Sequence, residues 1–141
     1  MSTLPRTTNE LVRTLARSTT AEELTEFLRL LSNRRRRLVD VSVFRLGPNE
    51  TIDLRTLASH IASVETDKKP ATITSTKRRT VYTNLDQHHL EGLADAQIIE
   101  YEKPGKHVCR GPAAPAVGTM LAAAVVVLEF LAPRKRDDAT S

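Results

Sequence analysis

The sequence lacks several features that define whole classes of protein. Its 141 residues include one cysteine, Cys109, no tryptophan and only 4% aromatic residues. A single cysteine excludes an intrachain disulfide and a thiolate zinc site, and it indicates a reducing compartment. Residues 1–20 are polar and contain no apolar run of the kind found in a secretory signal. We therefore expect a cytoplasmic protein.

Motifs of catalysis are also missing. The chain has no glycine-rich phosphate loop, no Ser/His/Asp arrangement and no pair of acids at an obvious acid–base spacing. The pair His88-His89 has no thiolate partner and falls on an apolar helix face, so we expect packed histidines and no metal site. Cys109 is expected to act as a small hydrophobic residue. We predict that the protein is not an enzyme and needs no cofactor.

The composition does favour one basic, mostly helical domain. Forty per cent of the residues are hydrophobic, the net charge is +4 and the pI is about 9.6. A chain of this length holds one compact domain with a tail, and a core of aliphatic residues without large aromatic ones suits helices. The positive charge favours a polyanionic partner, either nucleic acid or an anionic membrane surface.

The first half of the domain is predicted to be helical. We interpret residues 1–20 as a flexible arm, and Thr20 with Glu23 as a capping box that starts a helix ending near residue 31. Ser32-Asn33 offers a break and a new N-cap, and a second helix is predicted over residues 34–46, although its β-branched residues are also compatible with a strand. Gly47-Pro48-Asn49 ends it.

The second half of the domain is predicted to alternate short strands and helices. Residues 51–53 form a short extended piece, and Asp53 caps a helix with apolar residues at i, i+3, i+4, i+7 and i+8. After a loop over residues 66–73, Thr74 or Ser75 caps a longer helix that ends near Ala94. Residues 98–102 and 106–110 read as a hairpin around a glycine turn.

This order of elements is that of a winged helix-turn-helix, so the expected fold class is mainly α with a small β-hairpin. The winged domain is predicted to cover residues 21–111. A C-terminal apolar helix follows over residues 112–132, and a charged tail over residues 133–141.

The helix over residues 75–94 occupies the recognition position, and one of its faces contains no acid. Thr, Arg, Lys and Gln side chains donate hydrogen bonds to phosphates and base edges. An ordinary solvated helix face and a solvated charged hairpin are the alternatives. The predicted DNA-binding residues on the helix are Thr76, Lys77, Arg79, Thr80, Thr83 and Gln87, and those on the wing are Lys103, Lys106 and Arg110.

Four arginines, Arg34 to Arg37, lie at the N-terminus of a predicted helix, where the macrodipole disfavours cations. Their charge must therefore be compensated. Phosphate contacts and ion pairs with acids such as Glu22, Glu23 and Glu26 are both compatible with the sequence.

The apolar helix over residues 112–132 has two interpretations. In the first it forms a homodimer through a seam with coiled-coil spacing. In the second it associates with a membrane, but the run barely reaches the required length of about 20 residues. A span would also place Arg134-Lys135-Arg136 opposite a cytoplasmic domain, against the positive-inside tendency. We favour the dimer, with a seam of Val117, Leu121, Ala124, Leu128 and Leu131.

Several segments resemble an uncharacterised haloarchaeal-type family of winged-helix proteins. The resemblance covers roughly residues 22–110 and is carried by residues 31–38, 53–62, 78–85 and 88–101. Its most specific parts are Arg79-Thr80-Val81-Tyr82 and His89-Leu90-Glu91-Gly92-Leu93. It implies a DNA-binding regulatory domain but no particular operator or ligand. The basic pI departs from the acidic proteins of salt-adapted cells and leaves a host, viral or plasmid origin open, and the apolar tail lies outside the resemblance.

Taken together, the residues predict sequence-selective binding of double-stranded DNA by a small, dimeric transcriptional regulator of archaeal type. The alternative is a winged-helix module for protein–protein contact, associated with a membrane through residues 113–132.

Overall fold

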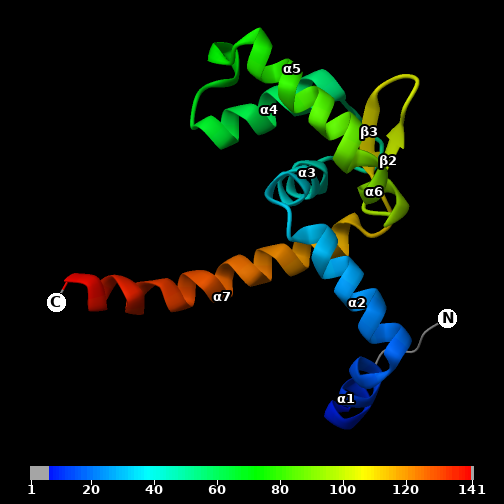
Figure 1. Ribbon diagram of the computed structural model, residues 1–141, viewed down its shortest axis with the longest axis vertical. Coiled ribbons are helices and arrows are strands. Elements are labelled where there is room, and N and C mark those ends of the chain that lie inside the picture. The colour runs from blue at the N-terminus through cyan, green and yellow to red at the C-terminus, as the bar shows by residue number, and fades with distance from the viewer. Residues whose placement is uncertain (1–6, 141) are drawn as a thin grey trace.

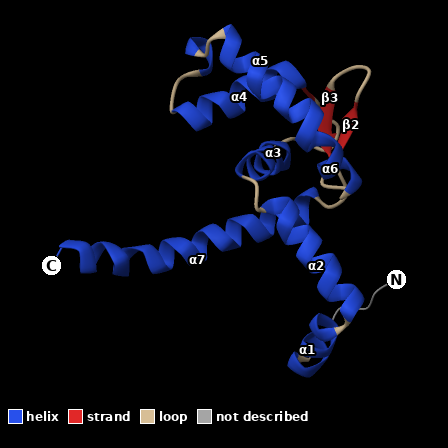
Figure 2. Ribbon diagram, viewed as in Figure 1, coloured by secondary structure: helices blue, strands red, loops and turns tan. Residues whose placement is uncertain are grey.

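The computed structural model describes residues 7–140, and the side chains of all of these except Ser18, Thr19 and residues 133–140. The protein is mainly helical with one small antiparallel sheet and a long C-terminal apolar helix, which confirms the expected fold class (Figures 1 and 2). The elements in chain order are α1 (Thr8–Ala16), α2 (Ser18–Leu31), α3 (Arg34–Phe44), β1 (Ile52–Asp53), α4 (Leu54–Thr66), η1 (Pro70–Thr72), α5 (Ser75–Asn84), η2 (Leu85–His89), α6 (Leu90–Asp95), β2 (Ile99–Glu102), β3 (His107–Arg110) and α7 (Ala114–Thr140).

The predicted N-caps of three helices are confirmed. The Asn33 side chain accepts hydrogen bonds from the first-turn amides of α3, Asp53 accepts from the Thr56 amide, and Thr74 accepts from the Lys77 amide. Each cap satisfies amides that have no partner within their own helix. These side chains therefore fix where α3, α4 and α5 begin.

The N-terminal segment differs from the prediction. Thr8–Ala16 forms helix α1, capped by Thr7, where we expected an arm without regular structure. The capping box at Thr20 is wrong, because α2 begins at Ser18 and Thr20 lies inside it. Helix α1 buries none of its residues. Residues 1–6 of the predicted arm lie outside the described part of the chain.

The three strands pair in the order β1-β3-β2, so β3, the second strand of the hairpin, lies in the middle of the sheet. Val108 of β3 is opposite Ile52 on one side and Tyr101 on the other, and it is fully buried. The predicted hairpin is confirmed. The turn contains Gly105 as expected, but Lys106, with φ of 54°, is the turn residue in the left-handed conformation.

Helix α4 supplies the centre of the core. Its buried residues Leu54, Leu57, Ala58, Ile61 and Ala62 are those of the predicted apolar stripe. Val39 and Val43 of α3 join the same cluster. Figure 1 shows α4 and α5 on one side of α3 and the beginning of α7 on the other.

The predicted long helix over residues 75–94 is three helical segments in succession, α5, η2 and α6. The π-helical segment η2 adds one residue to a turn, which changes the face that later side chains present. His89 is buried, whereas His88 is exposed. The prediction that both histidines pack in the core is therefore right for His89 and wrong for His88.

Helix α7 extends further than predicted, to Thr140, and only its first turns contact the domain. Ala114 and Val117 are buried, and Gly118 lies against the ring of Phe44 so closely that a Cβ atom would collide with it. Beyond these turns α7 projects away from the domain (Figure 1). The stretch Ala114–Ala132 is long and apolar enough to cross a membrane by length and composition alone, a test that a soluble core helix also passes.

Candidate nucleic-acid interface

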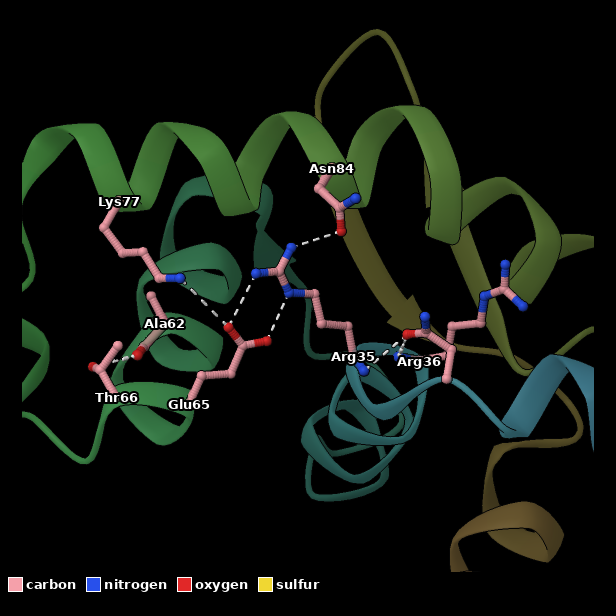
Figure 3. Close-up of polar contacts among 8 residues, drawn as sticks. Arg35, Arg36, Ala62, Glu65, Thr66, Lys77 and Asn84 are labelled. Atoms are coloured by element: carbon pink, nitrogen blue, oxygen red, sulfur yellow. Dashed lines mark hydrogen bonds and ion pairs between the residues drawn. The ribbon is translucent and has the colours of Figure 1, made fainter.

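A polar network on Arg35 joins α3, α4 and α5 (Figure 3). The Arg35 guanidinium makes a two-pronged ion pair with Glu65, with Nε 2.6 Å from Oε1 and Nη2 3.1 Å from Oε2. Its Nη1 also donates to Asn84 Oδ1 at 2.8 Å. Such paired hydrogen bonds fix both distance and orientation. The network therefore sets the position of α5 relative to α4.

One of the predicted DNA-binding residues, Lys77, forms an ion pair within the same network. Lys77 Nζ lies 3.9 Å from Glu65 Oε2, on the side away from Arg35. The hydrogen bond from Arg35 lowers the pKa of Glu65, with smaller contributions from the charges of Arg35, Lys77 and Arg34. The carboxylate is charged at neutral pH, and its charge is compensated within the protein.

Arg36 and Arg37, two other arginines of the run Arg34–Arg37, bind backbone carbonyls of the preceding helix. Arg36 Nη1 donates to Leu30 O, and Arg37 Nη1 donates to the carbonyls of Leu31 and Ser32. These carbonyls end α2, where cations are favoured by the macrodipole. Arginines at an unfavourable helix start thus cap the preceding helix, and the described contacts are not those with Glu22, Glu23 or Glu26 that the sequence suggested.

Arg36 also holds His89. Arg36 Nε donates to His89 Nδ1 at 3.1 Å, so that nitrogen carries no proton. Burial and then the nearby charge of Arg36 lower the pKa of His89. The histidine is a neutral packed residue. The described residues contain no group of three His, Cys, Asp or Glu side chains that could hold a metal ion.

A second polar cluster joins the β2–β3 hairpin, which is the predicted wing, to η2. Asp86 accepts hydrogen bonds from Tyr101 Oη at 2.6 Å and from Lys106 Nζ at 3.1 Å. The hydrogen bond from Tyr101 is the main cause of the lowered pKa of Asp86. The hairpin is therefore held against η2.

The wing offers fewer free cations than the sequence suggested. Lys106 pairs with Asp86, and Arg110 Nη1 donates to Leu46 O at 3.1 Å. Lys103, at the hairpin turn, is exposed. Lys103 is thus the predicted wing residue that is most available to a ligand.

The outer face of α5 is exposed as predicted. The residues Thr76, Arg79, Thr80, Thr83 and Gln87 all have exposed side chains. A hollow of about 410 Å³ lies along this face, and its lining contains no acid. It is lined by Arg79, Thr80, Thr83, Asn84, Gln87 and His88.

A second hollow, of about 310 Å³, lies on the other side of Arg79 and gathers three arginines. Arg55, at the start of α4, meets Arg78 and Arg79 of α5, together with Ser75 and Tyr82. In the described part of the chain none of these arginines is paired with an acid. Sequence reasoning missed Arg55 and Arg78, because the first lies on another helix and the second is half-buried beside the predicted face. The packing of α4 against α5 brings them together.

The residues of the predicted dimer seam divide into two groups. Val117 is buried and Leu121 is half-buried against the core of their own chain. Ala124, Leu128 and Leu131 are exposed. The first two therefore have a partner within the chain, and the last three do not have one in the described residues.

Comparison with known proteins gives one match. Residues 28–109 match a family described as a domain of unknown function, DUF7344. The matched segment runs from α2 to β3, so it contains the Arg35 network, the α5 face and the wing. No curated protein and no solved structure matches the chain. Since the match covers more than half of the sequence, the chain belongs to the DUF7344 family.

Proposed function

We propose that the protein binds double-stranded DNA in a sequence-selective manner, as a small transcriptional regulator. Helix α5 would enter the major groove and the hairpin β2–β3 would lie along the backbone as a wing. The resemblance to haloarchaeal-type winged-helix proteins motivates the same proposal.

The arrangement of the helices supports this function. The order α3, β1, α4, α5 and then a hairpin is that of a winged helix-turn-helix, in which the helix after the turn reads the groove. The major groove admits one α-helix. Arg35, by joining Glu65 and Asn84, would keep α5 presented at a fixed angle to α4.

The observation that carries the proposal is the three-arginine hollow beside the acid-free face of α5. A guanidinium group recognises a phosphate with paired hydrogen bonds. Arg55 and Arg78 would hold a backbone phosphate, while Arg79, which lines both hollows, faces the side where Thr80 and Thr83 are exposed. Phosphate contacts would thus fix the register of the helix, and the α5 face would read the bases.

Glu65 and Asp86, the acids of the two polar clusters, do not oppose this role. Each is paired with a lysine or arginine. A charge compensated inside the protein repels a phosphate much less than a free one. We therefore assign the DNA contacts to Arg55, Arg78, Arg79, Thr80, Thr83 and Lys103, and a supporting role to Lys77, Lys106 and Arg110.

The experiment that tests the proposal is selection of bound sequences from random duplex DNA, followed by competition between the selected and a scrambled duplex. Arg79→Ala is expected to cost about 1–3 kcal/mol on the selected duplex and to relax preference at one position. Arg55→Ala is expected to weaken both duplexes alike. Arg13→Ala, in the distant helix α1, is the matched control and should change neither.

Equal weakening of both duplexes by Arg79→Ala would remove the base-reading role of this face. Failure to select any sequence would remove sequence selectivity.

A second candidate, a winged-helix module for protein–protein contact, is favoured by the exposed apolar side chains of α7, such as Val126 and Phe130. In that case duplex DNA would not bind at low salt, and α7 would associate with a membrane or with another protein. The same selection experiment separates the two candidates.

A further inference from the structure

The free part of α7 is apolar on every side. The consecutive residues Val125, Val126, Val127 and Leu128 are 56%, 68%, 57% and 64% exposed, and successive side chains of an α-helix are about 100° apart, so these four surround the helix. Apolar surface of this extent on a soluble chain marks a site of association. We therefore expect the free part of α7 to be covered by a partner.

A groove with both apolar and acidic lining residues lies between α2 and α6. It encloses about 520 Å³, and Phe27, Leu30 and Ala96 contribute apolar surface to it. Four acids, Glu22, Glu23, Glu26 and Asp95, also line it. Only Glu26 has a basic partner among the described residues, Arg29. The groove suits a helix end that carries apolar side chains followed by cations.

This groove adjoins the point where α7 leaves the domain. Ala96 lines the groove, and the next residue, Gln97, accepts a hydrogen bond at 2.9 Å from the amide of Ala113, just before α7. Gly111 approaches the same carbonyl so closely that a Cβ atom would collide with it. The root of α7 and the acidic groove are thus held side by side.

The sequence of α7 itself matches the groove. The exposed Phe130 and Leu131 are followed in the chain by Arg134, Lys135 and Arg136. The helix continues through these positions to Thr140, so the basic residues lie at the end remote from the root. Reversing one α7 against another would bring the basic end of each to the root of the other.

We propose that two copies of the chain form a symmetric dimer in which their α7 helices pack antiparallel and the basic end of each α7 enters the acidic groove of the other copy. If Met120 of one copy lies opposite Leu131 of the other, residues 134–136 lie opposite residues 115–117, next to the groove. Ala124 and Leu128 then form the middle of the seam. Both contacts occur twice and close the assembly at two copies, as two-fold symmetry requires.

A lipid bilayer explains these observations less well. Since Ala114 and Val117 are in the core of the domain, the fully free apolar stretch begins at about residue 122 and ends at residue 132. That is about 16 Å of helix, roughly half the thickness of a bilayer core. Glu129 also lies inside this stretch. The proposal does not depend on DNA binding.

Disulfide cross-linking of the full chain tests the antiparallel arrangement. In a Cys109→Ser background, the double variant Met120→Cys/Leu131→Cys is expected to form a cross-linked dimer on mild oxidation. The variants with only one of these cysteines are expected to stay largely uncross-linked, because like positions are then about 16–18 Å apart. Strong cross-linking of each single variant would indicate a parallel pair and overturn the proposal.

Charge reversal tests the groove. Glu22→Lys/Glu23→Lys is expected to weaken the dimer at least tenfold by sedimentation equilibrium, and so is Arg134→Glu/Arg136→Glu. Mixing the two variants, or combining the four changes, should restore association. Glu50→Lys/Glu102→Lys, with the same change of charge on exposed residues away from the groove, is the matched control.

Three results would overturn the proposal. The first is a monomeric full chain. The second is a dimer that the charge reversals leave unchanged. The third is partition of the full chain into vesicles of phosphatidylcholine and phosphatidylglycerol, which would favour the membrane.

Discussion

Helices α4 and α7 are both rich in apolar residues, but most of these side chains are buried in α4 and exposed in α7. In α4 the apolar residues other than the exposed Val64 form one stripe, and the five residues of this stripe are buried in the core. In α7 the apolar residues surround the helix, and most of those beyond Leu121 are exposed. A helix with one stripe is completed by its own domain, whereas a helix that is apolar all round requires a partner outside it.

The largest expected effect is a difference in the free energy of unfolding when a leucine is replaced by alanine in each of these two helices. Leu57→Ala in α4 is expected to lower the free energy of unfolding by about 2–5 kcal/mol, because it leaves a cavity in a fully buried site. Leu128→Ala in α7 is expected to change it by no more than about 0.5 kcal/mol at concentrations where the chain is monomeric. Urea denaturation of both variants measures the difference. Equal losses would contradict the division between the two helices.

The next effect concerns the link between α3, α4 and α5. Arg35→Ala is expected to cost about 1–3 kcal/mol, because it removes the donor to Asn84 and leaves Glu65 with only the longer contact to Lys77 in a half-buried site. Arg29→Ala breaks the exposed pair with Glu26 and serves as the control, with an expected cost below about 1 kcal/mol.

The contribution of the Arg35–Glu65 ion pair to stability depends on pH in a defined way. The pKa of Glu65 is lowered from its ordinary value of 4.5, so its contribution is fully present above that value and is lost as the pH falls through the folded-state pKa. The loss of stability below pH 4.5 should be smaller in Arg35→Ala. An unchanged acid-unfolding profile would show that the ion pair contributes nothing.

A smaller effect of opposite sign is expected at Asp40 of α3. Its side chain is fully buried, and neither carboxylate oxygen has a hydrogen-bond partner among the described residues. Burial raises the pKa of Asp40 from 3.8 to about 6. The folded state therefore binds more protons than the unfolded state between these values, and stability falls as the pH rises from 3.8 to 6.

Replacement of Asp40 by asparagine removes the charge and keeps the shape. Asp40→Asn is expected to stabilise the protein by about 1–2 kcal/mol at pH 7.5 and by much less at pH 4. Thermal unfolding at the two pH values measures the gain, with the exposed Glu50→Gln as control. A loss of stability at pH 7.5 would mean that the carboxylate has a partner that compensates its charge.

The parts of the fold that the sequence predicts are those with local causes. Caps such as Asn33 and Asp53, and the apolar stripe of α4, act within a few residues and could be located from spacing alone. Helix α1 could not, because all its side chains but one are exposed and its apolar residues show only weak helical spacing. The exposure of His88 could not be predicted either, since it depends on the extra residue in the π-helical segment.

The candidate site shows the same limit. The exposed residues on one face of α5 follow from helical periodicity. Other contacts join residues that are far apart in sequence or on different helices. They are the ion pairs of Lys77 and Lys106 with acids and the hollow that Arg55 shares with Arg78 and Arg79. Such contacts depend on how helices cross, which a single sequence does not encode in any local pattern.

Titration of duplex DNA with the full chain over a series of salt concentrations tests the proposed function most directly. Each phosphate contact made by a cation contributes about −0.9 to the slope of log K against log salt. With the free cations of α4, α5 and the wing, about four to six contacts give a slope of about −4 to −5. Arg55→Ala/Arg78→Ala should make it less negative by about 2. A slope near zero, or no binding at low salt, would contradict the account.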